Sequence, residues 1–322
     1  MRKCPAALAI ATALLVLTLS SSYARAQFMS HNFRGDFGVL AGTQPPPGWW
    51  VAAGYVRFDT DTLRDDDGNS ITIDPLEGGS IGANGYAAGF WRVTEKKIFG
   101  GNYSFMAFPA WTDNKVEAPI LGLAQETGTG FTDLYFQPIN LGWHRERADY
   151  IAAIGVVAPL GSYDPDAVDN LGLGMWSFEL SGGATWYLDA AKSWHFATAA
   201  FYETHTKKKD TDIRVGDILT IEGGFGKSFM EGALTVGVAF DAQWKITEDD
   251  PGELQPVFDM LNVGRHRVYG VGVEATLPIA TKKKLIGFLT GRYMVDVEAR
   301  NTFEGTSFVL LATFPVPSVS LE

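Results

Sequence analysis

Ionisable residues recur at alternate positions in this chain, and that spacing places side chains on one face of a β-strand. Glu203 and His205 are separated by one residue, as are Arg57 and Asp59. Acid–base catalysis, metal binding and the polar lining of a passage all use such residues. By strand parity, one polar face is expected to carry eleven of them: Arg57, Asp59, Glu179, Glu203, His205, Glu222, Asp241, Lys245, Glu274, Arg292 and Asp296.

The spacing does not assemble a catalytic site. A barrel phospholipase carries His and Ser two positions apart, with a third polar group orienting the base. None of the five histidines is followed by Ser at that spacing: His31, His144, His195, His205 and His266. We therefore expect that the protein is not an enzyme, and a barrel hydrolase is the least favoured of the functions considered.

Metal-ligand and phosphate-binding patterns are also weak. Asp65, Asp67, Gly68 and Asp74 partly match a calcium loop, but Leu63 stands where the first ligand should be. The segment is therefore interpreted as an acidic surface turn. We found neither a thiolate metal site nor a glycine-rich phosphate loop, and the sequence predicts no metal and no cofactor.

Charged loops suggest contacts with the cell surface. The acidic run Glu248-Asp249-Asp250 can share loosely bound divalent cations with lipopolysaccharide phosphates. Lys207-Lys208-Lys209 could touch a phosphate directly, although a solvated loop tip is the favoured interpretation.

The strands themselves are predicted from an alternation of apolar and polar residues with period two. In Ala233–Ile246, for example, Leu234, Val236 and Val238 begin an apolar face, and the residues between them are polar or small. Such a strand fits a transmembrane barrel, with one face in lipid and the other in the lumen. The candidate strands are Gly48–Asp59, Asn84–Glu95, Phe99–Asp113, Gly130–His144, Asp149–Gly161, Met175–Leu188, Trp194–Thr206, Asp217–Phe229, Ala233–Ile246, Arg265–Ile279, Lys284–Glu298 and Gly305–Phe314.

The connections between these strands alternate in length. Those after the even-numbered strands are short, such as Lys96–Ile98 and Arg145–Ala148, and most of the others are long, such as Thr60–Ala83 and Thr247–Gly264. Short periplasmic turns and long outer loops are typical of outer-membrane barrels. The sequence therefore predicts an all-β fold, a transmembrane antiparallel up-and-down β-barrel of about 12 strands with both termini in the periplasm.

Residues 1–26 have the organisation of a secretory signal peptide. Arg2 and Lys3 precede an apolar run, and Ala24-Arg25-Ala26 matches a cleavage site. No later segment is long and apolar enough for a membrane helix. If the secreted chain enters a membrane, it must do so as a closed barrel, which predicts the outer membrane of a Gram-negative cell and insertion by the barrel-assembly machinery.

Charge and cysteine content exclude further functions. Cys4, the only cysteine, lies in the leader, so the mature chain has neither disulfides nor thiol chemistry. Without the three basic residues of the leader, the mature chain carries 23 basic and 37 acidic residues, a net charge of −14. That charge argues against nucleic acid as a partner.

The eleven polar-face residues are expected to line the lumen, because Arg or Lys on the lipid face near the midplane costs about 2–4 kcal/mol. They either pair with one another to fill a narrow barrel or contact a solute. Parity is ambiguous on the strands that contain Arg92, Gln137, Pro138 and Asn140. Barrels of eight strands are filled by side chains, and barrels of sixteen strands are open channels. A barrel of about 12 strands is therefore compatible with side chains that pair to fill the lumen and with side chains that contact a solute.

Residues 27–47 form a separate segment before the barrel, which is expected to span residues 48–314 and to be followed by a tail, 315–322. The segment carries Phe33, Phe37, Val39 and Leu40, and the run Pro45–Pro47 forces an extended, stiff entry into the first strand. It is interpreted either as a plug inside the lumen or as a periplasmic lead-in.

Several stretches carry a family resemblance. They read HNFRGDFGVLAGTQPPPGWWVAAGYVRF from His31, and later GTGFTDLYFQPINLGW, ADYIAAIGVVAPLGSYDP, GGATWYLD, GGFGKSF and RHRVYGVGVEATLPI. They resemble the outer-membrane family called the meta-pathway of phenol degradation proteins, which includes SphA-like transporters. The resemblance covers nearly the whole mature chain, and its most distinctive pieces are Gly42–Gly48 and Gly130–Leu134. It implies a barrel linked to hydrophobic or aromatic compounds, with no catalytic residues to carry over.

These observations predict an outer-membrane channel for the passive uptake of small hydrophobic or aromatic compounds. Membrane lipid, lipopolysaccharide and the solute are the expected partners. The alternative is a structural or adhesive barrel whose function lies in its acidic outer loops.

Overall fold

The computed structural model describes residues 28–72, 80–118, 123–167, 170–230, 234–261, 264–280 and 285–316. The predicted signal peptide, residues 317–322 of the predicted tail and Asp74 of the acidic turn lie outside them. Within the described ranges, no helix is long and apolar enough to cross a bilayer. The long strands are β1 (Gly48–Arg64), β3 (Ser80–Ile98), β4 (Gly101–Ala118), β6 (Gly130–His144), β7 (Ala148–Ala158), β8 (Ser177–Tyr187), β9 (Trp194–His205), β10 (Ile218–Phe229), β11 (Leu234–Lys245), β12 (Arg267–Ala280), β13 (Leu285–Arg300) and β14 (Thr302–Val316).

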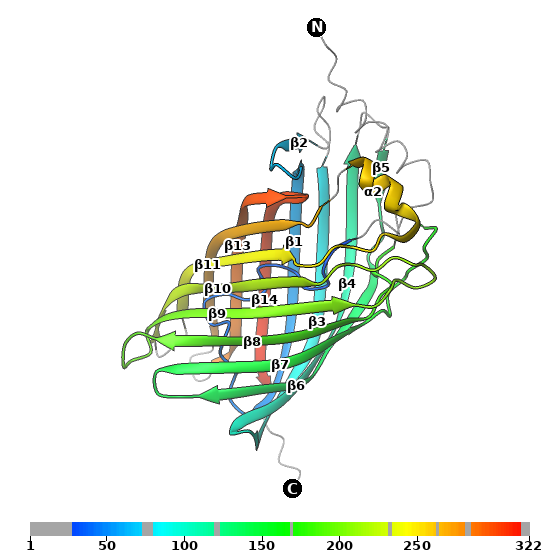
Figure 1. The fold of residues 1–322 in the computed structure, drawn as a ribbon. Helices are drawn as coiled ribbons and strands as arrows, with labels where there is room; N and C mark the ends of the chain where they lie inside the picture. The colour runs from blue at the N-terminus through cyan, green and yellow to red at the C-terminus, as the bar shows by residue number, and fades with distance from the viewer. Residues whose placement is uncertain are drawn as a thin grey trace.

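The twelve long strands form one closed antiparallel barrel (Figure 1). Each pairs with its neighbour along the chain, and β14 closes the sheet by pairing with β1. Closure pairs the first and last strands with each other, as a sheet that spans lipid requires. The predicted fold class is therefore confirmed.

Three smaller elements decorate the barrel. Strand β2 (Ser70–Thr72) pairs with β1, and β5 (Leu123–Glu126) pairs with β4. The short helix α2 (Gln255–Leu261) follows the 3-10 turn η4 (Gly252–Leu254) in the connection between β11 and β12. We take the end of the barrel with the long connections as the outer end, as in other outer-membrane barrels.

Alternation along the strands decides which side chains enter the barrel. On β11, Val238 is 56% exposed on the outer surface and Ala239 is 3% exposed inside. On β9, Phe196 faces outward and Ala197 is fully buried. The outward residues are the larger apolar ones, as a lipid-facing surface requires.

This alternation gives a prediction for stability. Val238→Arg should destabilise the barrel by about 2–4 kcal/mol if the residue lies near the membrane midplane. Ala239→Ser should be milder, because its side chain points inward, away from lipid, and a hydroxyl adds little volume beneath the lumenal segment. Urea unfolding in lipid vesicles, followed by the electrophoretic mobility of the folded barrel, measures both. Equal damage from the two substitutions would contradict the lipid-facing assignment of Val238.

A bulge resolves the ambiguous parity of β6. Its register with β7 shifts between Phe136 and Ile139, next to Pro138, which has no N–H to donate. Gln137 and Asn140 are three positions apart, yet both are buried, and the Asn140 side chain donates to Gln137 Oε1 at 2.8 Å. The bulge therefore turns both amides into the lumen.

Short turns join the strands at the periplasmic end. Between β3 and β4, Phe99 and Gly100 have φ values of 50° and 80°. Two consecutive positive φ values are typical of the type I′ turn, whose twist matches that of a tight hairpin. Phe99 is 91% exposed, so the turn presents its ring at the rim.

Candidate functional site in the barrel lumen

Residues 28–47, hereafter the lumenal segment, run through the interior of the barrel (Figure 1). At the outer end, Lys245 Nζ donates to the Phe28 carbonyl at 3.1 Å. Toward the periplasmic end, Gln44 Nε2 donates to Ser104 Oγ and Asn140 Oδ1, both at 2.9 Å. The segment therefore crosses the lumen along most of its length before β1 begins.

Arg34 anchors the middle of the lumenal segment. Its guanidinium lies 2.8 Å from Asp241 Oδ1 and 2.7 Å from Asp296 Oδ1, and a second nitrogen donates to Asp296 Oδ2 at 3.1 Å. The two carboxylate side chains are 2% and 5% exposed. Charge-assisted, bidentate hydrogen bonds of this kind are stronger and more directional than neutral ones, so Arg34 fixes the segment against β11 and β13.

Wall carboxylates also accept from the backbone of the segment. Glu203 accepts from the amides of His31 at 2.9 Å and Asn32 at 3.1 Å, and Glu222 accepts from the amide of Phe37 at 2.8 Å. An irregular segment has no strand partner for its N–H groups, and burying them unpaired is costly. These carboxylates therefore accept the hydrogen bonds that a neighbouring strand would accept in a β-sheet.

Arg292 and Glu274 form a further pair in contact with the segment. Their side chains lie 2.7 Å apart and are almost fully buried. Arg292 also donates to the Gly35 carbonyl, and Glu274 accepts from the Val39 amide at 3.3 Å. The pair is thus held by the segment as well as by its own attraction.

The wall is shaped to admit the backbone of the segment. The fully buried Val39 side chain lies over positions where β10 and β11 carry Gly226 and Gly237. At Gly42 an added Cβ would stand 2.1 Å from the backbone carbonyl carbon of Ala184. Any larger residue there would force the segment away from β8.

The structure brings nine of the eleven predicted residues to the inner face. Eight of them contact the lumenal segment or the cluster around His31, and Glu179 instead accepts from Tyr135 at 2.9 Å. The nine residues are Glu179, Glu203, His205, Glu222, Asp241, Lys245, Glu274, Arg292 and Asp296.

The prediction for Arg57 and Asp59 is wrong. Arg57 pairs in register with Phe308, which is 38% exposed, whereas the adjacent Phe58 pairs with the inward Ser307. Arg57 is the tenth residue of β1, and the strand continues to Arg64. A membrane-spanning strand needs only about 9–11 residues, so this ion pair reaches the outer rim, where charge on the outer face is tolerated.

One part of the inner wall is apolar. Strand registers place its side chains on the same face as the buried Ser307 and as Ser104, which accepts a hydrogen bond from Gln44 of the lumenal segment. We call it the apolar wall: Val56 and Phe58 of β1, Ala87 and Trp91 of β3, Met106 and Phe108 of β4, and Leu311 of β14.

The lumenal segment is bound mainly to the rest of the wall. Its hydrogen bonds reach β6 and β8 to β13, and they reach β4 only near its periplasmic end, at Asn102 and Ser104. Phe37 packs on Phe201 of β9 with ring centroids 4.8 Å apart, yet Phe37 and Leu40 each remain 37% exposed inside the barrel. Apolar side chains of the segment therefore share the remaining lumen with the apolar wall.

A Ser–His–Asp array lies at the outer end of this interior. Ser177 Oγ is 2.6 Å from His31 Nδ1, and His31 Nε2 is 2.9 Å from Asp133 Oδ2. The three groups match the composition of a hydrolytic triad. Ser177 is only 1% exposed, however, and its hydroxyl also meets His205 Nδ1 at 2.8 Å, so no substrate can reach it without rearrangement.

The chain matches, over residues 60–312, the family described as putative MetA-pathway of phenol degradation. It belongs to that family. None of the curated proteins compared with the chain matches it. The family confirms the resemblance seen in the sequence, and the barrel fold places the protein in the outer membrane of Gram-negative cells.

The first of three similar solved structures supports the same fold. An outer-membrane channel from Pseudomonas putida F1 is 13% identical, with a TM-score of 0.65 over 89% of this chain and 100% of that one. The β domain of the Bordetella autotransporter BrkA is 13% identical, with a TM-score of 0.40 over 84% of this chain and 99% of that one. The transport unit of AIDA-I from Escherichia coli is 9% identical, with a TM-score of 0.42 over 92% and 96%.

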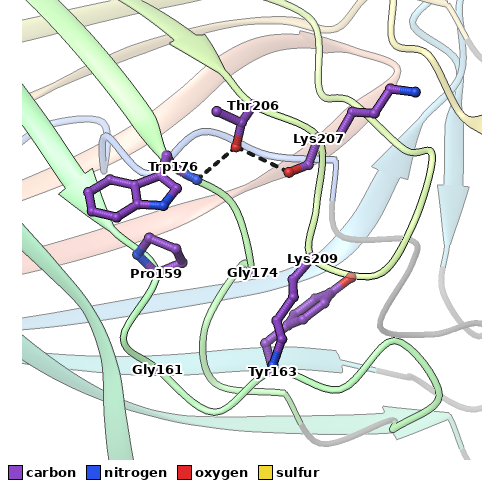
Figure 2. Close-up of a pocket in the computed structure, with 8 residues that line it drawn as sticks. All are labelled: Pro159, Gly161, Tyr163, Gly174, Trp176, Thr206, Lys207 and Lys209. Atoms are coloured by element: carbon purple, nitrogen blue, oxygen red, sulfur yellow. Dashed lines mark hydrogen bonds between the residues drawn. The ribbon is translucent and has the colours of Figure 1, made fainter.

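This family member also carries a pocket of about 270 Å³ at its outer end (Figure 2). Its rim includes Tyr163, Trp176, Lys207 and Lys209, and Thr206 Oγ1 accepts from the Trp176 amide at 3.1 Å. Aromatic rings and ammonium groups together suit a flat aromatic molecule. The pocket lies above β7, β8 and β9.

Lys208 corrects the interpretation of the three lysines as a solvated loop tip. Lys207 and Lys209 are exposed, but Lys208 is 1% exposed and its Nζ has no hydrogen-bond partner among the described residues. Its Nζ lies 5.6 Å from the centroid of the Tyr163 ring. Burial lowers the pKa of Lys208 to about 8 from its ordinary 10.5.

Lys208→Met should therefore stabilise the barrel at pH 7 by up to about 3 kcal/mol. The charged lysine is disfavoured in the folded protein, so the wild type loses stability as pH falls from 10.5 to about 8 and stays at the lower level below that. The gain from the substitution should then fade above pH 10. Urea unfolding at both pH values measures it, with Lys209→Met as the exposed control. A gain independent of pH would contradict a buried ammonium.

Sequence reasoning missed several residues of this interior. Ser177 shares a face with Glu179 two positions later, so strand parity could have found it. Asp133 lies on β6, the strand whose parity was ambiguous in the sequence. The binding of Arg34 and His31 to the wall had no signal, because an irregular segment has no periodicity to read.

Proposed function

We propose that this family member is a channel for the passive uptake of small hydrophobic or aromatic compounds. The observation that carries the proposal is the apolar wall, which faces the part of the lumen that the lumenal segment leaves uncovered. Apolar side chains such as Phe58, Trp91 and Phe108 offer contact to an apolar solute without requiring it to make hydrogen bonds. Membership of a family described by phenol degradation supports the same solute class.

The lumenal segment occupies part of the lumen, which supports an upper limit on the size of the solute. Arg34 and its two carboxylates hold the lumenal segment in place, so a large solute would have to displace a buried ion cluster. The aromatic and cationic pocket around Trp176 is the proposed first contact of an aromatic solute on the outside. The buried Ser177 has a structural role in this proposal, and the protein is not an enzyme.

The proposed partners of the barrel are membrane lipid, lipopolysaccharide and the machinery that inserts it. Its outward apolar residues contact membrane lipid, and its acidic outer loops meet lipopolysaccharide through shared divalent cations. The barrel-assembly machinery inserts it.

Uptake by cells that express the protein tests the proposal. Accumulation of radiolabelled toluene should exceed that of cells lacking the protein and should persist after an uncoupler collapses the proton gradient. Ala87→Trp should reduce the uptake rate because it fills space at the apolar wall. Ala88→Trp is the matched control, since that residue lies on the outer face and is exposed to lipid.

Two outcomes would overturn the proposal. Equal uptake by Ala87→Trp and the wild type would remove the apolar wall from the path. No toluene uptake above the background, with the folded barrel present at the cell surface, would favour the structural or adhesive function of the acidic loops instead.

A further inference from the structure

A cluster of possible metal ligands joins the lumenal segment to the barrel wall near its outer end. His31 comes from the segment, and Glu203 and His205 come from β9, where a spacing of two puts both side chains inside. One ligand atom from each residue lies within 4.8 Å of the others. All three belong to one buried group rather than to a loop surface.

The distances from the carboxylate to the two imidazoles are close to those of a tetrahedral site. Glu203 Oε1 lies 3.7 Å from His31 Nδ1 and 3.4 Å from His205 Nδ1. Around a zinc ion with bonds of about 2.0–2.1 Å, tetrahedral ligand atoms stand about 3.3–3.4 Å apart. Only small side-chain movements would therefore bring the three atoms to one ion.

Both imidazoles aim the same nitrogen at one point. Ser177 Oγ lies there, 2.6 Å from Nδ1 of His31 and 2.8 Å from Nδ1 of His205. The hydroxyl can donate to one of these nitrogens and accept from the Nδ1–H of the other, so both nitrogens are engaged while Ser177 keeps this position. A rotation of the Ser177 side chain would free the point on which the three ligands converge.

A second carboxylate orients His31 as a ligand. His31 Nε2 lies 2.9 Å from Asp133 Oδ2, and Asp133 is itself fixed by the backbone amides of Gly161 at 3.1 Å and Leu173 at 2.9 Å. Metal-binding histidines donate their other ring N–H to a carboxylate in this way, which leaves the first nitrogen free for the ion. The surrounding hydrogen bonds are thus those that a metal site requires.

We propose that His31, Glu203 and His205 bind one divalent transition-metal ion of the zinc class and that the ion fastens the lumenal segment to β9. Two imidazoles and one carboxylate suit zinc, and the fourth position is open to water. The site is independent of which solute the lumen carries.

Zinc binding to the purified, untagged, refolded protein tests the proposal. Equilibrium dialysis should find one zinc per chain, and cobalt should give visible absorption bands of tetrahedral intensity. His31→Ala and His205→Ala should each weaken zinc binding by at least about tenfold, and Asp133→Asn by about 10–100-fold. Zinc should also raise the temperature at which the folded wild-type barrel unfolds, because the ion binds only the folded state.

Two variants serve as controls. His144→Ala should bind zinc as the wild type does, because that residue lies at the periplasmic end of β6. Ser177→Ala should bind zinc at least as tightly, because it clears the converging point without removing a ligand. His31 lies outside the strands, so His31→Ala should keep the mobility of the folded barrel. The proposal is overturned if the folded wild type binds no stoichiometric zinc, or if His31→Ala binds it as tightly as His144→Ala.

Discussion

Deleting Phe28–Leu40 should raise the single-channel conductance of the barrel several-fold. The deletion removes most of the lumenal segment, which lies along β8 to β13 and narrows the path. The wall carboxylates that it leaves behind, including Glu203 and Glu222, would be hydrated by the wider lumen, so their exposure should cost little. Planar bilayer recordings measure the conductance, and the heat-modifiable mobility of the folded barrel confirms that the variant is intact.

The path of residues 28–47 through the lumen contradicts the interpretation of this segment as a periplasmic lead-in. The deletion tests whether the segment also limits permeation. A folded deletion variant with unchanged conductance would show that the segment does not limit permeation. Arg265→Met is a suitable control for the recordings, because its partner Glu248 lies in the outer loop before β12 and both side chains are more than half exposed.

Arg34→Met should destabilise the folded barrel by about 3–5 kcal/mol, more than the deletion does. With the rest of the segment in place, Asp241 and Asp296 would remain buried and would lose the cation between them. A single substitution should therefore be more harmful than the removal of thirteen residues that include it. Urea unfolding in vesicles compares the two variants with the wild type.

The exposed pair Arg265–Glu248 gives the matched control. Its ion pair spans 3.0 Å, but the side chains are 53% and 69% exposed. Arg265→Met should change the free energy of unfolding by no more than about 1 kcal/mol. If Arg34→Met were equally mild, the central ion cluster would not be the anchor of the segment.

The barrel itself could be predicted well from the sequence. The period of two located all twelve long strands, and the bounds of β6 were predicted to the residue. On β8 to β13 the parity also separated lipid-facing from inward residues, because each of those strands contrasts large apolar side chains with charged or small ones.

The parity of β1 could not be predicted in the same way. The assignment of Arg57 and Asp59 to the lumen assumed that the whole strand lies in lipid. The strand continues to Arg64, so the assumption fails near its outer end. Charge alone cannot distinguish a lumenal residue from one on the outer face above the membrane.

The contacts in the centre of the lumen could not be predicted from the sequence for a different reason. His31 meets Ser177 and Asp133 across 146 and 102 residues of chain. Such contacts depend on how an irregular segment docks, and no local pattern encodes that. The apolar wall could not be predicted either, because the inner face of β1 was assigned to the wrong side and the parity of β3 was ambiguous. Only the strand registers show that its residues form one surface.

The pairing of β1 with β14 has a consequence for the order of assembly. The seam joins the first and last long strands of the chain, so it carries the largest loop-closure entropy of any ladder in the protein. The lumenal segment is covalently attached to β1 through Pro45–Pro47. It must therefore be inside the barrel before β1 pairs with β14, because the segment could not easily enter a barrel that is already closed. The contacts of Arg34 with Asp241 and Asp296 would then form during assembly and hold the last strands near β1. Loss of Arg34 would slow the closure of the barrel as well as destabilise the folded protein.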